Sequence, residues 1–342
     1  MSVGSSAFSG SSPGGLFQSI NFMQLYMLLI LLRVHLPKKI IDFILLNDIF
    51  NFNIKIPGLR SLPLIKSLLF IFKIEHSDEA LHNLSVDSVS TFYNLFDHLV
   101  IFLATVGIHL IFWLMKSICP KRKSENCIVR LTYWIANKVW SLLTFTIYIR
   151  TIMQVSQFWM ISAVSELYEA NFSSDATSFS FAVAVSAVCG VIIFAVVNGI
   201  LCLWYPNSLI DYFKEYFSGM KNTKIAKMYN VVLMTRRIAL VSLMACLRHL
   251  DKVYLVLIAV CYQIAHTVLI VLIRPYASVK DNINEIMIDV IFSVLLITLM
   301  YFNTEDTWNE VVASTYFYLL SFLGIFIFLS SIGESRLFDL CS

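Results

Sequence analysis

Long apolar segments alternate with short polar loops along most of the chain, and the sign of the loop charge alternates with them. A helix needs about 20 mainly apolar residues to cross the hydrocarbon core of a bilayer, and the sequence supplies seven or eight such segments. Hydrophobic residues make up 58% of the chain and the mean hydropathy is +0.77, well above an ordinary soluble domain. The pattern predicts an all-α, polytopic transmembrane helical bundle of about eight spans, within a range of 7–9.

The predicted bundle occupies residues 95–332. We expect its spans at about 95–117, 148–168, 179–204, 231–248, 252–273, 284–302 and 312–332. An eighth apolar run, residues 16–34, follows a flexible leader (1–15) and is the weakest candidate span because it contains Asn21 and Gln24.

The segment between the first run and the bundle, up to residue 94, is expected to be membrane-proximal and outside. Within it, residues 38–52 place apolar side chains at helical spacing against charged ones, which predicts an interfacial amphipathic helix. Residues 62–74 are apolar but too short to span. After the bundle, residues 333–342 are expected to form a cytoplasmic tail.

The positive-inside rule orients the predicted bundle. The connections after residues 117, 204 and 273 are rich in lysine and arginine, whereas those after residues 168 and 302 carry acids and no base. We therefore expect the first set and the C-terminus to be cytoplasmic, in a plasma membrane or an endomembrane. The sequons at Asn83 and Asn171 both fall on the expected outer side, as candidate glycosylation sites.

Aromatic and basic residues near the predicted span ends are candidate interfacial anchors, because such side chains favour the membrane–water boundary. Residues 128–147 are expected to lie along the cytoplasmic interface on this ground. The candidate anchors are Arg150, Arg274, Trp134 and Trp140.

Four charged residues are expected near the cytoplasmic ends of two spans. Because ionised groups are costly in lipid, each of them must have a partner that compensates its charge. Arg236 and Arg237 begin one span, and Glu285 and Asp289 share a face of another because they are four residues apart. One interpretation is an arginine–carboxylate cluster that braces or gates the bundle. The other places the arginines on lipid phosphates and the acids at the water boundary.

Three further polar residues fall inside predicted spans: His109, His266 and Asn198. The histidines could relay protons and the asparagine could coordinate an ion. The alternative for all three is a hydrogen bond to a neighbouring helix.

The sequence gives no support for an enzyme. It has no HExxH, no Gly-Lys-Ser/Thr phosphate loop, no GxSxG and no CxxC pair. A net charge of +3 is too small to indicate nucleic acid as a partner. No cofactor, metal or small-molecule substrate is indicated, so the expected partner is the lipid bilayer, with homo-oligomerisation left open.

Two blocks in the second half of the chain carry a set of short motifs. They are KNTKIAKMYNVVLMTRRIALVSLMACL (221–247) and LIRPYASVKDNINEIMIDVIF (272–292). A paired-arginine helix start precedes an Arg-Pro-aromatic stop, and an Asn-x-x-Glu entry to the next helix follows. The matching residues are Arg236, Arg237, Arg274, Pro275, Tyr276, Asn282 and Glu285, with Asp289 as the second acid. In this set the chain resembles transient-receptor-potential-like multi-pass membrane proteins of fungi and protists, especially ciliates, over roughly residues 20–330.

The resemblance implies a cation-channel or transport-related role. A tetrameric channel of that superfamily has a re-entrant pore between its last two spans, but the corresponding loop here is only about nine residues long. The alternative is a non-conducting membrane anchor or receptor module, the C-terminal part of a larger surface protein. The sequence leaves both functions open.

Overall fold

A computed structural model describes a helical protein. The described residues are 24–25, 28–32, 34, 36–46, 55–74, 86, 88–118, 145–169, 172–204, 217, 220–247, 249–301 and 310–332. Within them no β-strand occurs, and a single isolated antiparallel bridge joins Met220 to Tyr276. The predicted all-α class is confirmed.

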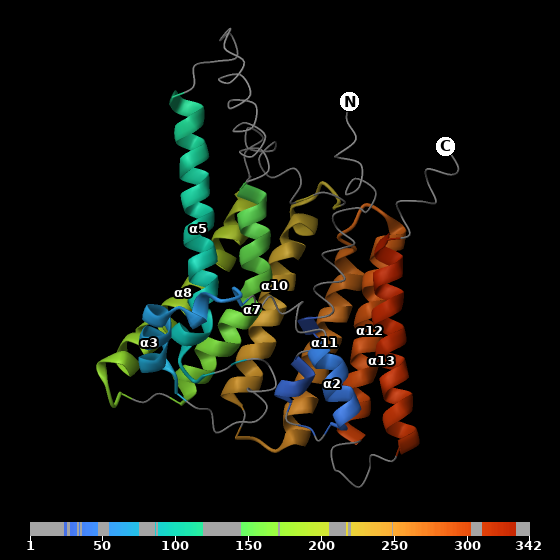
Figure 1. Cartoon of the computed structure of the whole chain (residues 1–342). Helices are drawn as coiled ribbons and strands as arrows, with labels where there is room; N and C mark the ends of the chain where they lie inside the picture. The colour runs from blue at the N-terminus through green and yellow to red at the C-terminus, as the bar shows by residue number, and fades with distance from the viewer. Residues whose placement is uncertain are drawn as a thin grey trace.

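Seven long helices of the described part correspond to the seven spans predicted for residues 95–332, and they run side by side in alternating directions (Figure 1). They are α5 (Thr91–Ile118), α7 (Phe145–Tyr168), α8 (Asp175–Trp204), α10 (Lys224–Cys246), α11 (Lys252–Ile273), α12 (Val279–Tyr301) and α13 (Glu310–Ile332).

Five of these helices are long and apolar enough to cross a membrane. These spans are Thr91–Met115, Asp175–Trp204, Lys224–Cys246, Lys252–Ile273 and Val279–Met300. In the most apolar part of the first, only 6% of the residues are buried, so side chains there, such as Phe102 and Leu103, face outward as lipid contacts would. The chain is therefore an integral membrane protein. The count of eight spans stays a prediction.

α7 is not among the five apolar spans although it lies inside the bundle. It packs against α5, α8 and α10, and its polar side chains Gln154, Gln157 and Glu166 are buried there. A helix enclosed by others can carry polar groups that a lipid-facing helix cannot, because neighbouring helices supply hydrogen-bond partners.

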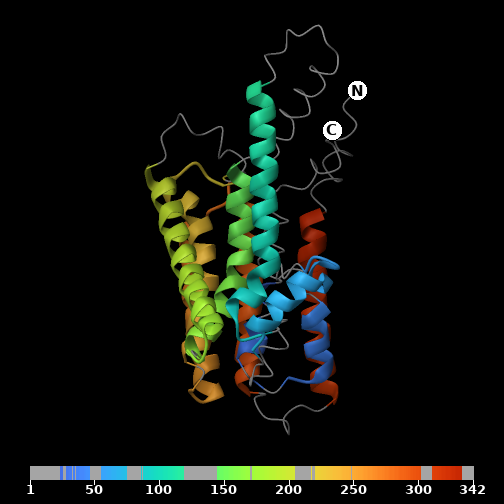
Figure 2. The ribbon, with the colours of Figure 1, turned by 60° about the vertical axis from the view of Figure 1, so that its left-hand side comes forward.

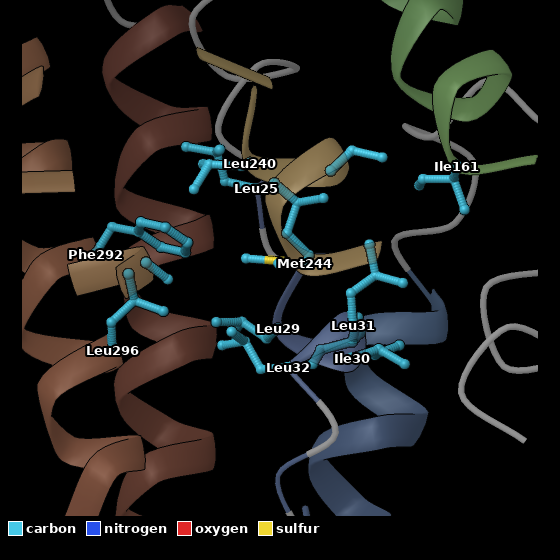
Figure 3. Close-up of a cluster of buried hydrophobic side chains, with 14 of the residues drawn as sticks. Leu25, Leu29, Ile30, Leu31, Leu32, Ile161, Leu240, Met244, Phe292 and Leu296 are labelled. Atoms are coloured by element: carbon cyan, nitrogen blue, oxygen red, sulfur yellow. The ribbon is translucent and has the colours of Figure 1, made fainter. Parts of the chain in front are cut away.

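The first apolar run lies in the middle of the structure. Residues 24–25 and 28–31 are helical, and Leu25, Leu29 and Leu32 are at most 3% exposed. Figure 3 shows them gathered with Met244 of α10 and Phe292 of α12 in one apolar cluster. This segment therefore joins the group α5, α7, α8 and α10 to the pair α11 and α12.

Two short helices follow, and both are amphipathic. α2 (Lys38–Leu46) confirms the first part of the helix predicted for 38–52, and residues 47–52 lie outside the described residues. It buries Ile40 and Ile44 while Lys38 and Lys39 stay exposed. It packs on α13, where the rings of Phe43 and Phe317 are 5.5 Å apart (Figure 2).

α3 (Pro63–Phe72) follows a short 3-10 turn (Leu59–Ser61) and contacts α5 and α8. It buries Leu69 but exposes Leu64 and Ile71 on one flank and Lys66 on another. Apolar and lysine flanks side by side are typical of a helix in a membrane interface.

The two ends of the bundle differ in charge. α10 and α12 begin, and α8 and α11 end, at a common end (Figure 1), which we call the basic end. The described acid there, Asp281, is outnumbered by the described bases Lys221, Lys224, Lys227, Arg274 and Lys280. At the opposite end, bases such as Lys38, Lys39, Lys66 and Lys252 are accompanied by acids such as Asp42, Glu169, Asp175 and Glu310, so the two ends differ in net charge. α2 and α3 lie toward the opposite end.

Candidate functional site

Arg236 and Asp289 form an ion pair deep inside the bundle. Arg236 Nη1 lies 2.9 Å from Asp289 Oδ1, and the side chains are 3% and 0% exposed. Both residues are near the middle of 23-residue helices, about 15–18 Å from the helix starts at 1.5 Å per residue. That distance is roughly half the hydrocarbon thickness of a bilayer.

The predicted position near helix ends is wrong for Arg236, Arg237 and Asp289, whereas Glu285 lies only six residues after Val279, the first residue of α12. α10 begins at Lys224, well before the predicted start at residue 231, because Thr223 caps it: its side chain accepts a hydrogen bond from the Ala226 N–H. The early start moves Arg236 and Arg237 into the helix middle. The same shift at α12, which begins at Val279, moves Asp289 inward.

Asp289 has a second partner on a third helix. His266 Nδ1 of α11 lies 2.7 Å from Asp289 Oδ2. One turn earlier on α11, Gln263 accepts a 2.7 Å hydrogen bond from Arg236 Nη2. A single buried carboxylate therefore ties α10, α11 and α12 together.

Glu285 lies one turn nearer the basic end than Asp289. It accepts a 2.8 Å hydrogen bond at Oε1 from the hydroxyl of Tyr229, and both side chains are buried. The ring of Tyr229 packs edge-on against Tyr276, with centroids 5.8 Å apart. We call Tyr229, Arg236, Gln263, His266, Glu285 and Asp289 the charge network.

The turn between α11 and α12 closes the network at the basic end. Asn282 accepts from the Tyr276 N–H at 3.0 Å and donates to the Tyr276 carbonyl at 2.7 Å. Arg274 caps α11 with a left-handed φ of 46°. The Arg-Pro-aromatic and Asn-x-x-Glu motifs therefore form one turn that holds Tyr276 against the network.

Arg237 points to a different set of partners from its neighbour. Its Nη1 donates to Gln24 Oε1 and, at 3.3 Å, to Gln154 Oε1. Gln24 in turn donates to the Gln154 carbonyl at 2.9 Å, and Gln157 donates to the Gln24 carbonyl at 2.8 Å. The structure brings Arg236 and Asp289 together but not Arg237 and a carboxylate, among the described residues.

All four predicted charges lie inside the protein rather than at a lipid or water boundary. Arg236, Arg237, Glu285 and Asp289 are between 0% and 4% exposed. The arrangement in which the arginines reach lipid phosphates is therefore not the one the structure shows. Burial between helices replaces the headgroup contacts with protein partners.

Several polar atoms in this region have no hydrogen-bond partner among the described residues. They are Arg236 Nε, Arg237 Nε and Nη2, His266 Nε2 and Glu285 Oε2. Buried polar groups are normally paired, so each unpaired atom indicates a place for water or an ion.

The other predicted residues are placed individually. His109 is half-buried, and its Nδ1 lies 3.1 Å from the Tyr148 hydroxyl on α7. Asn198 is 3% exposed, and its side-chain nitrogen finds no partner in the described part of the chain. Arg274 Nε donates to the Val271 carbonyl at 3.3 Å on the exposed surface.

Several candidates lie outside what the structure describes. For Arg150 only the backbone, in α7, is described. Trp134, Trp140, Asn83 and Asn171 lie outside the described residues, as does the segment 128–144 predicted to lie along the interface.

Sequence reasoning missed Tyr229, Gln263 and Gln154. The signal was present: Tyr229 lies seven residues before Arg236, and Gln263 lies three before His266, which places each pair on one helix face. Polar residues in apolar spans at such spacings can be listed from sequence, but the partner helix cannot.

A second buried polar cluster joins α5, α7 and α8 toward the opposite end. Glu166 accepts from the Thr91 N–H at 2.7 Å and from the Ser180 hydroxyl at 2.9 Å. Asn94 donates to the Ser162 hydroxyl at 2.8 Å. We call these five residues the Glu166 cluster.

None of the family models, curated proteins or solved structures searched matches this chain. Among the described residues, no group of three or more His, Cys, Asp or Glu side chains could hold a metal ion.

Proposed function

We propose that the protein transports protons or small cations across its membrane and that the charge network is part of the pathway. The observation that supports this most is Asp289, fully buried at mid-helix between Arg236 and His266. Ionisable groups at membrane depth are expensive, and where they occur they commonly mark ion pathways and proton relays.

The geometry supports transfer along α12. Glu285 and Asp289 share one face, and Glu285 is nearer the basic end. Asp289 holds the imidazole of His266 by Nδ1, so Nε2, which has no described partner, is available to exchange a proton. The second oxygen of Glu285 is equally available.

We further propose that the basic end and the C-terminus are cytoplasmic, because lysine and arginine outnumber the acids in the loops at that end. The resemblance to transient-receptor-potential-like membrane proteins agrees with a transport role. On this proposal the pathway enters from the cytoplasm through Tyr229 and Glu285.

Flux from purified protein in liposomes tests the proposal. Glu285→Gln keeps an acceptor for Tyr229 but removes the charge, and should lower proton or cation flux by about tenfold or more, which corresponds to ~1.4 kcal/mol. Glu310→Gln is the matched control, because Glu310 is 89% exposed, and it should leave the flux unchanged.

Asp289→Asn should also abolish flux. The same substitution leaves Arg236 without its counter-charge, so a loss of flux in this variant alone does not separate transport from folding. The paired variant Arg236→Gln with Asp289→Asn removes both charges and keeps the measurement interpretable. Wild-type protein that inserts correctly and gives no flux of H⁺, Na⁺ or K⁺ above empty liposomes would refute the proposal.

A second candidate is the non-conducting anchor or receptor module. The observation that favours it is the apolar cluster in Figure 3, where Leu25, Leu29 and Leu32 pack with Met244 and Phe292. Such packing would interrupt a polar route, and the charges would then only brace the helices. In that case the paired variant would change stability in a protein that gives no flux at all.

A further inference from the structure

Arg237 is the one charge of the four that the proposed pathway does not use. It is 2% exposed in the middle of α10. A guanidinium ion in a low-dielectric interior costs several kcal/mol unless an opposite charge and hydrogen bonds compensate it. The compensation of Arg237 therefore has to be accounted for.

No carboxylate of the described residues provides it. Asp289 is paired with Arg236 and His266, and Glu285 accepts from Tyr229. Arg237 itself contacts the amide oxygens of Gln24 and Gln154, which are neutral.

The unused donors of Arg237 share one edge. Nη1 makes both hydrogen bonds to the glutamines, whereas Nε and Nη2 are buried without a described partner. Nε and Nη2 together form the forked edge of a guanidinium, the edge that binds anions with two parallel hydrogen bonds. The edge that is left open is therefore the one best suited to an anion.

We propose that Arg237 is the centre of a buried binding site for a small monovalent anion such as chloride. The anion bonds to Nε and Nη2, while Gln24 and Gln154 hold the opposite edge of the guanidinium in place. A single negative charge neutralises the single uncompensated cation, which a water molecule on the same edge would not do.

The site has a structural consequence for the first apolar run. Gln24 belongs to that run, Gln154 to α7 and Arg237 to α10. An anion that fixes the guanidinium also fixes the position of Gln24, so the occupied site holds residues 24–25 and 28–32 against α10 and α12. Anion binding should therefore stabilise the whole bundle.

Thermal unfolding of the purified protein in detergent provides the first test, with sodium chloride and sodium gluconate compared at equal ionic strength. Chloride should raise the unfolding temperature along a saturating curve, because a ligand that binds only the folded state stabilises it. Arg237→Gln should remove the chloride dependence. Arg274→Gln, at an exposed arginine of the α11 end, should retain it.

Equilibrium binding of radioactive chloride provides the second test and does not require transport. One chloride per chain is expected for the wild type and none for Arg237→Gln. If that variant does not fold, Arg237→Lys is used instead, because lysine keeps the positive charge but lacks the two parallel donors of the guanidinium. It should bind chloride at least about tenfold more weakly than the wild type. Equal unfolding temperatures in the two salts together with no bound chloride would show that water occupies the edge and would overturn the proposal.

Discussion

Two buried polar regions of this protein contain carboxylates, one in the Glu166 cluster and two in the charge network, yet the regions are built differently. In the Glu166 cluster the carboxylate accepts from a backbone N–H and a hydroxyl, and Thr91, which supplies that N–H, is the first residue of α5. Glu166 therefore acts as an N-terminal cap provided by another helix. Its neighbours are hydrogen-bonded to one another.

The charge network is instead built on ion pairs between side chains, and some of its polar atoms have no hydrogen-bond partner among the described residues. Asp289 is shared by Arg236 and His266, while His266 Nε2 and Glu285 Oε2 have no described partner. A fully satisfied polar cluster rigidifies a structure, whereas unsatisfied polar atoms are costly and require another occupant. Burial of polar groups alone thus does not indicate function; incomplete pairing is the more informative sign.

The largest effect of a single substitution is expected at Asp289. Asp289→Asn leaves Arg236 as an uncompensated buried cation, so the free energy of unfolding should fall by about 3–5 kcal/mol. Chemical unfolding in detergent micelles measures it. The paired variant Arg236→Gln with Asp289→Asn should recover most of the loss, and an equal loss in both variants would contradict the ion-pair account.

Glu166→Ala should have the next largest effect, and on stability alone. It leaves the Thr91 N–H and the Ser180 hydroxyl short of an acceptor, at a cost of about 2–3 kcal/mol. Ion flux per inserted molecule, measured in liposomes, should stay at the wild-type level. A loss of flux without a loss of stability would place Glu166 in the pathway and contradict a purely structural role for the Glu166 cluster.

Tyr229→Phe should produce a smaller loss. The variant deprives Glu285 of a hydrogen bond inside the bundle, at a cost of about 1–2 kcal/mol in unfolding free energy, and it should also alter flux because Glu285 belongs to the proposed route. Tyr254→Phe is the matched control on α11, since Tyr254 is 60% exposed. Identical behaviour of the two variants would count against a special role for the Tyr229 hydroxyl.

The smallest effect is expected at the surface. Lys39 and Glu310 lie 4.0 Å apart with side chains 65% and 89% exposed, and such pairs contribute at most about 1 kcal/mol, often nothing measurable. Glu310→Gln should therefore leave the unfolding temperature nearly unchanged at physiological salt. A marked drop would show that α2 depends on this pair rather than on Phe43 and Phe317 for its contact with α13.

Much of the fold could be predicted because helix formation in membranes is a local property. The seven runs from residue 95 onward each became a helix, and α11 matched its predicted range of 252–273. Helix ends were less predictable. α10 begins early because of the Thr223 cap, and α7 is buried despite its polar residues because neighbouring helices enclose it.

The candidate site could be predicted only in part from the sequence, for a related reason. The unusual residues Arg236, Arg237, Glu285 and Asp289 could be picked out by their charge within apolar surroundings, but charge does not say which atoms will meet. Arg237 finds Gln24, which is 213 positions away along the chain, and no local pattern encodes that contact.

The sequence by itself determined that this chain is a membrane-embedded helical protein, since the length and apolarity of each segment are carried by consecutive residues. Only the tertiary structure decided that two adjacent arginines have different partners, and that Leu25 and residues 28–32 lie inside the bundle. Those outcomes depend on which helix faces touch, and contact between faces is a property of three-dimensional packing.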